Sequence, residues 1–147
     1  MITNEVQRRS TEAHLRQFEA AIANLEAKDP GSTGRSKLAQ LEIDALRSQA
    51  EDLRRELEEY ERLRSGTVSS FEASSLQDLA TLLIKARVAR GWSQRQLADL
   101  LGIAEQQVQR YETTGYRSAS LARICDVADA LEVTVTERLS LRGPDAA

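Results

Sequence analysis

The chain has 147 residues, which is enough for one ordinary domain or two small ones. Charged residues make up 29% and aromatic residues 4%, a balance that favours exposed helices over a large aromatic core. The net charge of −3 at pH 7 excludes a chain that is basic throughout, so nucleic-acid binding would need a local basic patch. The single cysteine, Cys125, excludes an intrachain disulfide and favours a reducing cytoplasm, and its place between Ile124 and Val127 on a predicted helix predicts a buried thiol. No long apolar run is present, and residues 1–5 lack the apolar core of a signal peptide, so we expect no membrane partner.

The first half of the chain carries two helical patterns separated by a breaker. Residues from about 3 to 28 have apolar positions spaced three and four apart, and a Pro- and Gly-containing cluster at 28–34 ends this helix. A longer helix is predicted at about 35–65, where apolar residues alternate spacings of four and three, as in the seam of a coiled coil. These residues are Ala39, Ile43, Leu46, Ala50, Leu53, Leu57 and Tyr60. The pattern predicts an antiparallel, coiled-coil-like helical hairpin over residues 1–65.

A lone hairpin covers only one side of each apolar stripe. The stripe is therefore expected to meet a further partner, which is either the same hairpin from a second copy, giving a homodimer, or a different protein. The residues expected at this dimer or partner interface are Ile43, Leu46, Leu53, Leu57 and Tyr60.

The second half of the chain is set off by a break in the helical pattern. Residues 66–74, rich in Ser, predict a linker with a short strand around 68–71, and residues 75–78 resemble a capping box that opens the next helix. From there, five helices are predicted at about 75–90, 93–101, 104–112, 119–131 and 134–140. Residues 75–141 thus form a second domain, followed by a frayed tail at 142–147. The predicted fold class is all-α.

Residues 92–112 predict two short helices joined by a sharp turn at Gly102, where glycine adopts a left-handed conformation without steric penalty. Ser93 can cap the first helix, and the small Ala98 permits a close crossing of the two helices. The second helix carries glutamines and an arginine, side chains that can hydrogen-bond two atoms of one base edge at once. A helix-turn-helix that displays them fits the major groove of DNA. The sequence therefore predicts a domain that binds double-stranded DNA.

Residues 75–140 resemble the five-helix, lambda-repressor-like DNA-binding domain of the phage-repressor or Xre family. The resemblance rests on three groups of residues: Arg87-x-x-Arg90-Gly91-Trp92-Ser93-Gln94-x-x-Leu97-Ala98, then Gly102-Ile103 with Val108-x-x-Tyr111-Glu112, and finally Ala128-x-x-Leu131-x-Val133. It implies a sequence-specific transcriptional regulator that binds an operator.

The resemblance also implies roles for individual residues. Arg110 would pair with guanine, Gln106 with adenine, and Glu105 would accept from a cytosine amino group or repel wrong sequences. Gln94 would contact the DNA backbone and support the recognition helix, and the loop after that helix would meet phosphates. The complete set of residues expected to contact DNA is Ser93, Gln94, Glu105, Gln106, Gln107, Arg110, Thr113, Thr114 and Arg117.

Four further residues are singled out by the comparison with that family. Arg87 and Glu112 match a pair that forms a structural salt bridge, so we assign them to the fold. Ala104 replaces the usual Ser or Thr cap, so the recognition helix is expected to begin without a side-chain cap. Tyr116 is expected to pack either on a sugar or on the core.

These features predict a cytoplasmic, dimeric transcriptional repressor that associates with the nucleoid when it is bound to DNA. The overall layout also resembles HigA-type antitoxins, which would imply a protein toxin as partner and autoregulation of a shared operon. An alternative from another class is a protein-interaction adaptor that acts through the hairpin. We expect no enzymatic activity, no cofactor and no metal, because His14 is the only histidine and no nucleophile has a base beside it.

Overall fold

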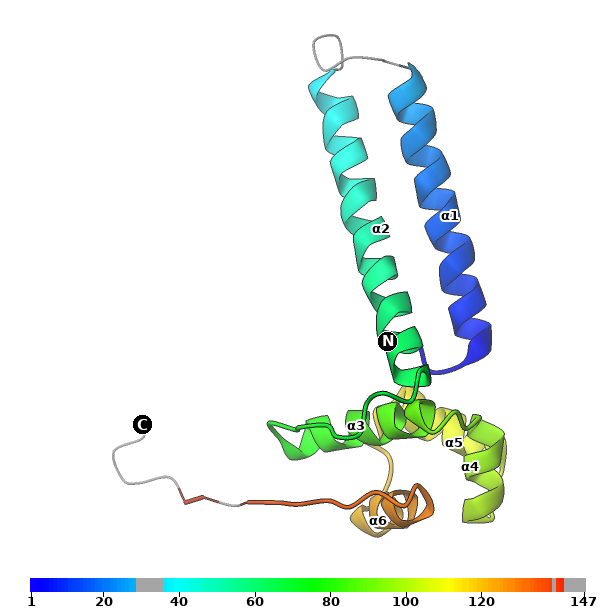
Figure 1. Cartoon of the computed structure of the whole chain (residues 1–147), viewed down its shortest axis with the longest axis vertical. Helices are drawn as coiled ribbons and strands as arrows, with labels where there is room; N and C mark the ends of the chain where they lie inside the picture. The colour runs from blue at the N-terminus through cyan, green and yellow to red at the C-terminus, as the bar shows by residue number, and fades with distance from the viewer. Residues whose placement is uncertain (29–35, 139, 142–147) are drawn as a thin grey trace.

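The computed structural model describes residues 1–28, 36–138 and 140–141. These residues form no strand and six α-helices, namely α1 (Glu5–Lys28), α2 (Lys37–Arg64), α3 (Leu76–Ala89), α4 (Gln94–Leu101), α5 (Glu105–Thr113) and α6 (Leu121–Ala130). The predicted all-α fold class is confirmed. As Figure 1 shows, α1 and α2 form a long antiparallel hairpin that stands on the four shorter helices.

The hairpin forms because α1 and α2 bury one narrow apolar stripe between them. Ile43 and Ala50 of α2 are completely buried in this stripe. Three ion pairs also join the two helices, Glu19 with Arg54, Glu26 with Arg47 and Arg8 with Glu61. An exposed ion pair contributes at most about 1 kcal/mol, so apolar burial rather than charge holds the hairpin together. Of the predicted breaker at 28–34, only Lys28 lies within the described residues.

Four of the helices begin at a serine whose hydroxyl oxygen accepts a hydrogen bond from the third following backbone N–H. Each of these caps satisfies a helix N–H that has no partner inside the helix, which stabilises a helix by about 1 kcal/mol. The serines are Ser36 for α2, Ser75 for α3, Ser93 for α4 and Ser120 for α6. At α4 the Gln96 side chain also accepts from the Ser93 backbone N–H, which completes a capping box.

The four shorter helices enclose one apolar core, to which each of them contributes. Removing an aliphatic side chain of this size from water contributes about 1.5–3 kcal/mol to folding. The buried residues of this core are Ala80, Leu83, Ile84, Ala86, Leu97, Ala98, Val108, Tyr116, Val127 and Leu131.

The prediction of a fifth helix in this domain, at 134–140, is wrong. The structure describes residues 134–138 and 140 of this range, and they are not helical. Residues 133–138 and 140 are exposed or half-buried chain without regular structure. Glu132 adopts a left-handed conformation, with φ of 50°, directly after α6. The following Val-Thr-Val-Thr run is β-branched, and such side chains lose rotamer freedom in a helix. The predicted tail at 142–147 lies outside the described residues.

Two smaller expectations are also wrong. The segment 68–71 forms no strand, because the described chain places no second strand beside it. Its two apolar residues, Val68 and Phe71, instead pack half-buried against the cores. Cys125, which the pattern placed among buried residues of its helix, is exposed.

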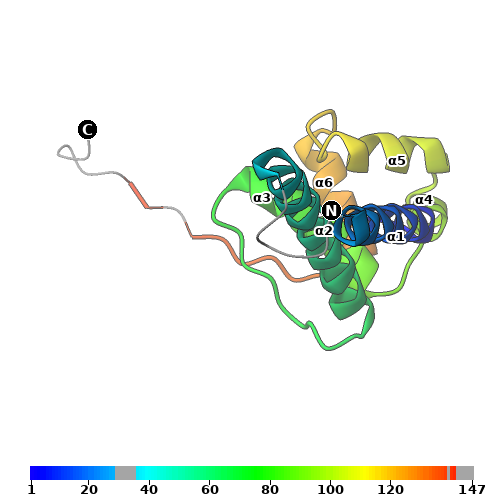
Figure 2. The same cartoon turned by 90° about the horizontal axis from the view of Figure 1, so that it is seen from above.

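The hairpin is attached to the four-helix domain by a second apolar cluster. This cluster consists of Ile2, Tyr60, Leu63 and Val88, and Ile2 is only 3% exposed. Polar contacts surround it, including an ion pair of 2.6 Å between Lys85 of α3 and Glu59 of α2. Seen from above in Figure 2, the hairpin rises over the domain with α5 along one side of it. The linker at 66–74 therefore joins two regions that are packed together.

The stripe that was expected at a dimer or partner interface divides into two groups. Ile43 and Tyr60 are buried within the single chain, so their apolar surface is already covered. Leu46, Leu53 and Leu57 are half-buried and retain surface that a second chain could cover. None of the described helices combines the length and the apolarity needed to cross a membrane.

Candidate nucleic-acid interface

The turn between α4 and α5 depends on Gly102. This residue ends α4 in the left-handed region, with φ of 64° and ψ of 34°. The Ile103 N–H then donates to the carbonyl of Ala98 at 3.0 Å, which closes the end of the helix. Only glycine adopts this conformation without a steric penalty. As predicted, α5 begins at Ala104 without a side-chain cap.

The inner face of α5 is held by an apolar residue and an aromatic pair. Val108 is 1% exposed, and the rings of Tyr111 and Tyr116 stack with their centroids 5.9 Å apart. Tyr116 is buried in the core, and this burial raises the pKa of its hydroxyl above the ordinary value. Of the two expectations for Tyr116, packing on the core is therefore the correct one.

A buried ion pair fixes α5 to α3. The Arg87 Nε donates to Glu112 Oε1 at 2.5 Å, and Arg87 Nη2 donates to Glu112 Oε2 at 2.7 Å. Both side chains are 1% exposed. Two further donors of the guanidinium reach backbone carbonyls, Nη1 that of Trp92 at 2.6 Å and Nη2 that of Thr3 at 2.8 Å. Because the geometry is bidentate and four hydrogen bonds are made, the charge is well compensated despite its burial.

Gln94 belongs to the same network and is 8% exposed. Its Nε2 donates to Glu112 Oε2 at 2.7 Å, while its Oε1 accepts from Asn4 Nδ2 at 3.5 Å. The first residue of α4 is therefore bonded to α5, which is the supporting role that the resemblance implied. Its side-chain groups already have partners inside the chain.

The outer face of α5 presents polar side chains to solvent. Gln106 and Arg110 are exposed, and neither side chain has a hydrogen bond or an ion pair in the described part of the chain. Gln109 is also exposed and donates to Glu105 Oε1 at 3.3 Å. Glu105 and Gln107 are half-buried at the flanks of this face. The free amide and guanidinium groups thus lie on the outer face of α5, whose inner face is bonded to α3 and α4.

The residues that flank this helix divide into free and occupied groups. Thr113 donates to the carbonyl of Gln109 at 2.8 Å, and Thr114 to that of Arg110 at 3.0 Å. Ser93 accepts from the Gln96 N–H as a cap. Among the loop residues after α5, Arg117 is exposed and has no side-chain partner within the described residues. Arg117 is therefore the available cation on this side of the helix.

Sequence reasoning missed the role of the N-terminal residues. Ile2 enters the cluster with α2 and α3, the Thr3 carbonyl accepts from Arg87, and Asn4 bonds to Gln94. The available signal was Asn4, a residue type favoured at the start of a helix. In the structure Asn4 Oδ1 accepts from the Gln7 N–H at 2.9 Å. The spacing of residues along the sequence does not predict which distant residues Asn4 contacts.

These features define a class of protein. A short helix, a left-handed glycine and a second helix with a free polar face, set on one helical core, form a helix-turn-helix domain that binds DNA. Residues 83–138 match the family model described as Helix-turn-helix, and this match supports a helix-turn-helix of the Xre or phage-repressor type in this part of the chain. The match supports DNA binding and transcription regulation. No curated protein and no solved structure gives a significant match to the chain.

Proposed function

We propose that the protein is a sequence-specific repressor that binds its operator as a dimer. The observation that supports this proposal is the outer face of α5. There, Gln106 and Arg110 are exposed and unpaired, while Glu112 on the same helix is locked to α3 and α4. A rigid helix with unoccupied bidentate groups loses little conformational entropy when it binds a base edge.

In this proposal each exposed group has a distinct partner on the duplex. Arg110 donates to O6 and N7 of a guanine, and Gln106 pairs with an adenine. Arg117 contacts a phosphate, which sets the register of the protein without reading sequence. Glu105, Gln107, Thr113 and Thr114 lie at the edges of the contact, and the backbone at Ser93 and Gln94 faces the sugar-phosphate chain. Repression needs no chemistry, because occupancy of a promoter excludes polymerase.

Selection from a library of randomised 30-base-pair duplexes tests the proposal. We expect the full-length protein to enrich one motif with partial two-fold symmetry, because two copies would place two recognition helices about one helical turn apart. Enrichment of no motif by the wild-type protein would contradict sequence-specific binding.

Replacement of Arg117 by alanine tests the phosphate contact. We expect Arg117→Ala to weaken binding of all duplexes alike and to reduce the slope of log K against log salt by about 1, since one released counterion is lost. Fluorescence anisotropy at several salt concentrations measures both quantities. A loss confined to one base position would show that Arg117 reads sequence instead.

The hairpin is the part of the chain that we propose forms the dimer. Its stripe keeps half-buried Leu46, Leu53 and Leu57 on α2, and Leu38 and Leu41 near the start of that helix are 76% and 60% exposed. Apolar surface of this kind on a helical hairpin is covered well by a second hairpin in a four-helix arrangement.

Leu53→Asp is expected to disrupt this assembly, because it places a charge on an apolar stripe that the second hairpin would bury. We expect the sedimentation mass to fall from that of two chains to that of one, while circular dichroism shows the helices retained. An unchanged dimer mass for a folded Leu53→Asp protein would remove this stripe from the interface.

The same exposed leucines favour a second candidate, a hairpin that captures a different protein. In its adaptor form, the helix-turn-helix serves only as a scaffold. In the antitoxin form that resembles HigA, the partner is a toxin and DNA binding is retained. Charge reversal at Arg110 and Arg117 separates the adaptor from a DNA-binding regulator. An adaptor keeps its activity in this variant, whereas a regulator no longer binds its operator.

A further inference from the structure

The hairpin starts beside the recognition helix. Residues of α1, namely Glu5 and Val6, line the same cleft, of about 310 Å³, as Glu105 and Gln109 of α5. Ser93, Gln94 and Gln96 at the beginning of α4 also line it. Figures 1 and 2 show the same arrangement, with α1 rising from the end of the domain where α4 lies.

The start of α1 is held in this place by residues of both apolar and polar character. Ile2 is buried between α2 and α3, the Thr3 carbonyl accepts from Arg87, and Asn4 caps α1 while it donates to Gln94. Since Arg87 and Gln94 both bond to Glu112 of α5, the position of α1 is fixed relative to the recognition helix.

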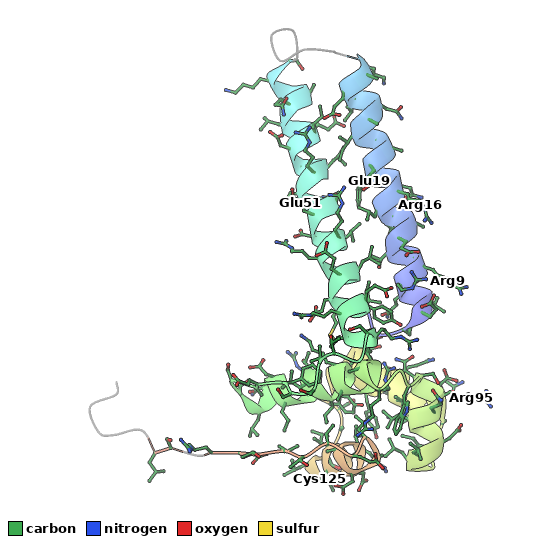
Figure 3. All side chains as sticks on the ribbon, viewed as in Figure 1. Arg9, Arg16, Glu19, Glu51, Arg95 and Cys125 are labelled. Carbon is green, nitrogen blue, oxygen red and sulfur yellow. The ribbon has the colours of Figure 1, made fainter. Side chains whose placement is uncertain are left out.

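The face of α1 above the cleft carries arginines. Arg9 follows Glu5 by four residues and Val6 by three, so it lies one turn higher on the face that lines the cleft. Arg16 follows Arg9 by two further turns. Figure 3 shows Arg9 and Arg16 on the same side of the molecule as Arg95 of α4. The Arg9 side chain is 75% exposed, and Arg16 is exposed too, without a partner in the described chain.

The carboxylate of Glu5, which lines the cleft, is paired with two arginines of its own helix. Glu5 pairs with Arg8 at 2.7 Å and with Arg9 at 3.2 Å. Chiefly through the hydrogen bond from Arg8, the pKa of Glu5 is lowered to about 2, so Glu5 stays ionised and bound. Arg8, which also pairs with Glu12, donates two hydrogen bonds to Glu5 at 2.9 and 2.7 Å. Glu5 therefore keeps a partner when the exposed Arg9 turns to a second anion.

The shape of DNA places such anions beside α5. The major groove is about 12 Å wide, and a helix with its side chains is about 10–12 Å across. A recognition helix in the major groove therefore has one sugar-phosphate strand along each side. In the proposed function Gln106 and Arg110 enter the groove, and Glu105 and Gln109, which line the cleft shared with α1, lie on one flank of the helix.

Building on the proposed function, we propose that α1 makes a second, sequence-independent contact with DNA. In this contact Arg9 and Arg16 bind phosphates of the sugar-phosphate strand along the Glu105 and Gln109 side of α5. The hairpin then extends the footprint beyond the helix-turn-helix, and the N-terminal residues hold it in register. The wider contact also compensates for the small positive excess of the domain, in which residues 75–117 carry six basic and four acidic side chains.

The test uses the full-length protein and a duplex recovered by the selection described above. We expect Arg9→Gln to reduce the slope of log K against log salt by about 0.9, so that the ratio of wild-type to variant affinity changes about 3.5-fold between 50 and 200 mM salt. Arg9→Gln together with Arg16→Gln should reduce the slope by about 1.8. Base preference should stay unchanged, and melting curves should be those of the wild type.

Arg55→Gln provides the matched control, because Arg55 is 73% exposed and pairs with Asp52 on its own helix, much as Arg9 pairs with Glu5. We expect this control to keep the wild-type slope. A wild-type slope for the double variant overturns the inference, as does tighter binding, which would show that α1 obstructs the duplex. If Arg110→Ala still loses its base preference, the proposed function stands without this contact. If selection yields no motif, both proposals fail together.

Discussion

Replacement of Glu112 by alanine is expected to destabilise the helix-turn-helix domain by about 3–5 kcal/mol. The substitution leaves the Arg87 guanidinium, 1% exposed, without its bidentate partner, and it also removes the acceptor of the Gln94 amide. A buried cation without a counter-charge has a large desolvation penalty. Since domains of this size are stable by only about 5–15 kcal/mol, most of the stability would be lost.

Urea denaturation measures this effect, and the double variant Arg87→Met with Glu112→Leu is its control. Replacing both charges by apolar side chains removes the stranded cation, so the double variant should be more stable than either single variant. Some loss should remain, because the Trp92 and Thr3 carbonyls lose their donor. A cost below about 1 kcal/mol for Glu112→Ala would show that the pair is dispensable.

The second large effect is expected at Arg110. Arg110→Ala should leave the fold unchanged, because the side chain is exposed and has no partner in the described chain. Binding of the selected duplex should weaken by about 1–3 kcal/mol, and the preference at one base pair should disappear. Duplexes that already carry the wrong base there should bind variant and wild type nearly alike.

Competition among duplexes that differ at single base pairs measures this prediction. Arg62→Ala, an exposed arginine on α2, serves as the control and should keep both affinity and preference. An equal loss on every duplex for Arg110→Ala would contradict base reading and would place Arg110 among the phosphate contacts.

The sequence predicted the elements with strong local signals. Periodic apolar residues located the helices through α6, and Gly102 marked the turn at the residue where the chain adopts a left-handed conformation. The expectation failed at 134–140, because a run of β-branched residues outweighs a weak helical pattern. Local spacing also failed to show that Cys125 would face solvent.

The site itself was only partly predictable, because its support is non-local. The polar face of α5 follows from residue types and period alone. By contrast, the contacts from Thr3 to Arg87 and from Asn4 to Gln94 span 84 and 90 residues. No period in a single sequence encodes such a pairing. The N-terminal residues therefore looked like the beginning of a separate hairpin.

The location of Ile2 and Thr3 makes the hairpin and the DNA-binding half one cooperative unit. Any molecule that binds the hairpin more tightly in its native geometry also stabilises the Arg87 network, and with it the orientation of α5. By thermodynamic linkage, DNA held by α5 stabilises the hairpin to the same extent. Thr3 and Arg87, which are 84 residues apart along the chain, thus couple the stability of the two regions.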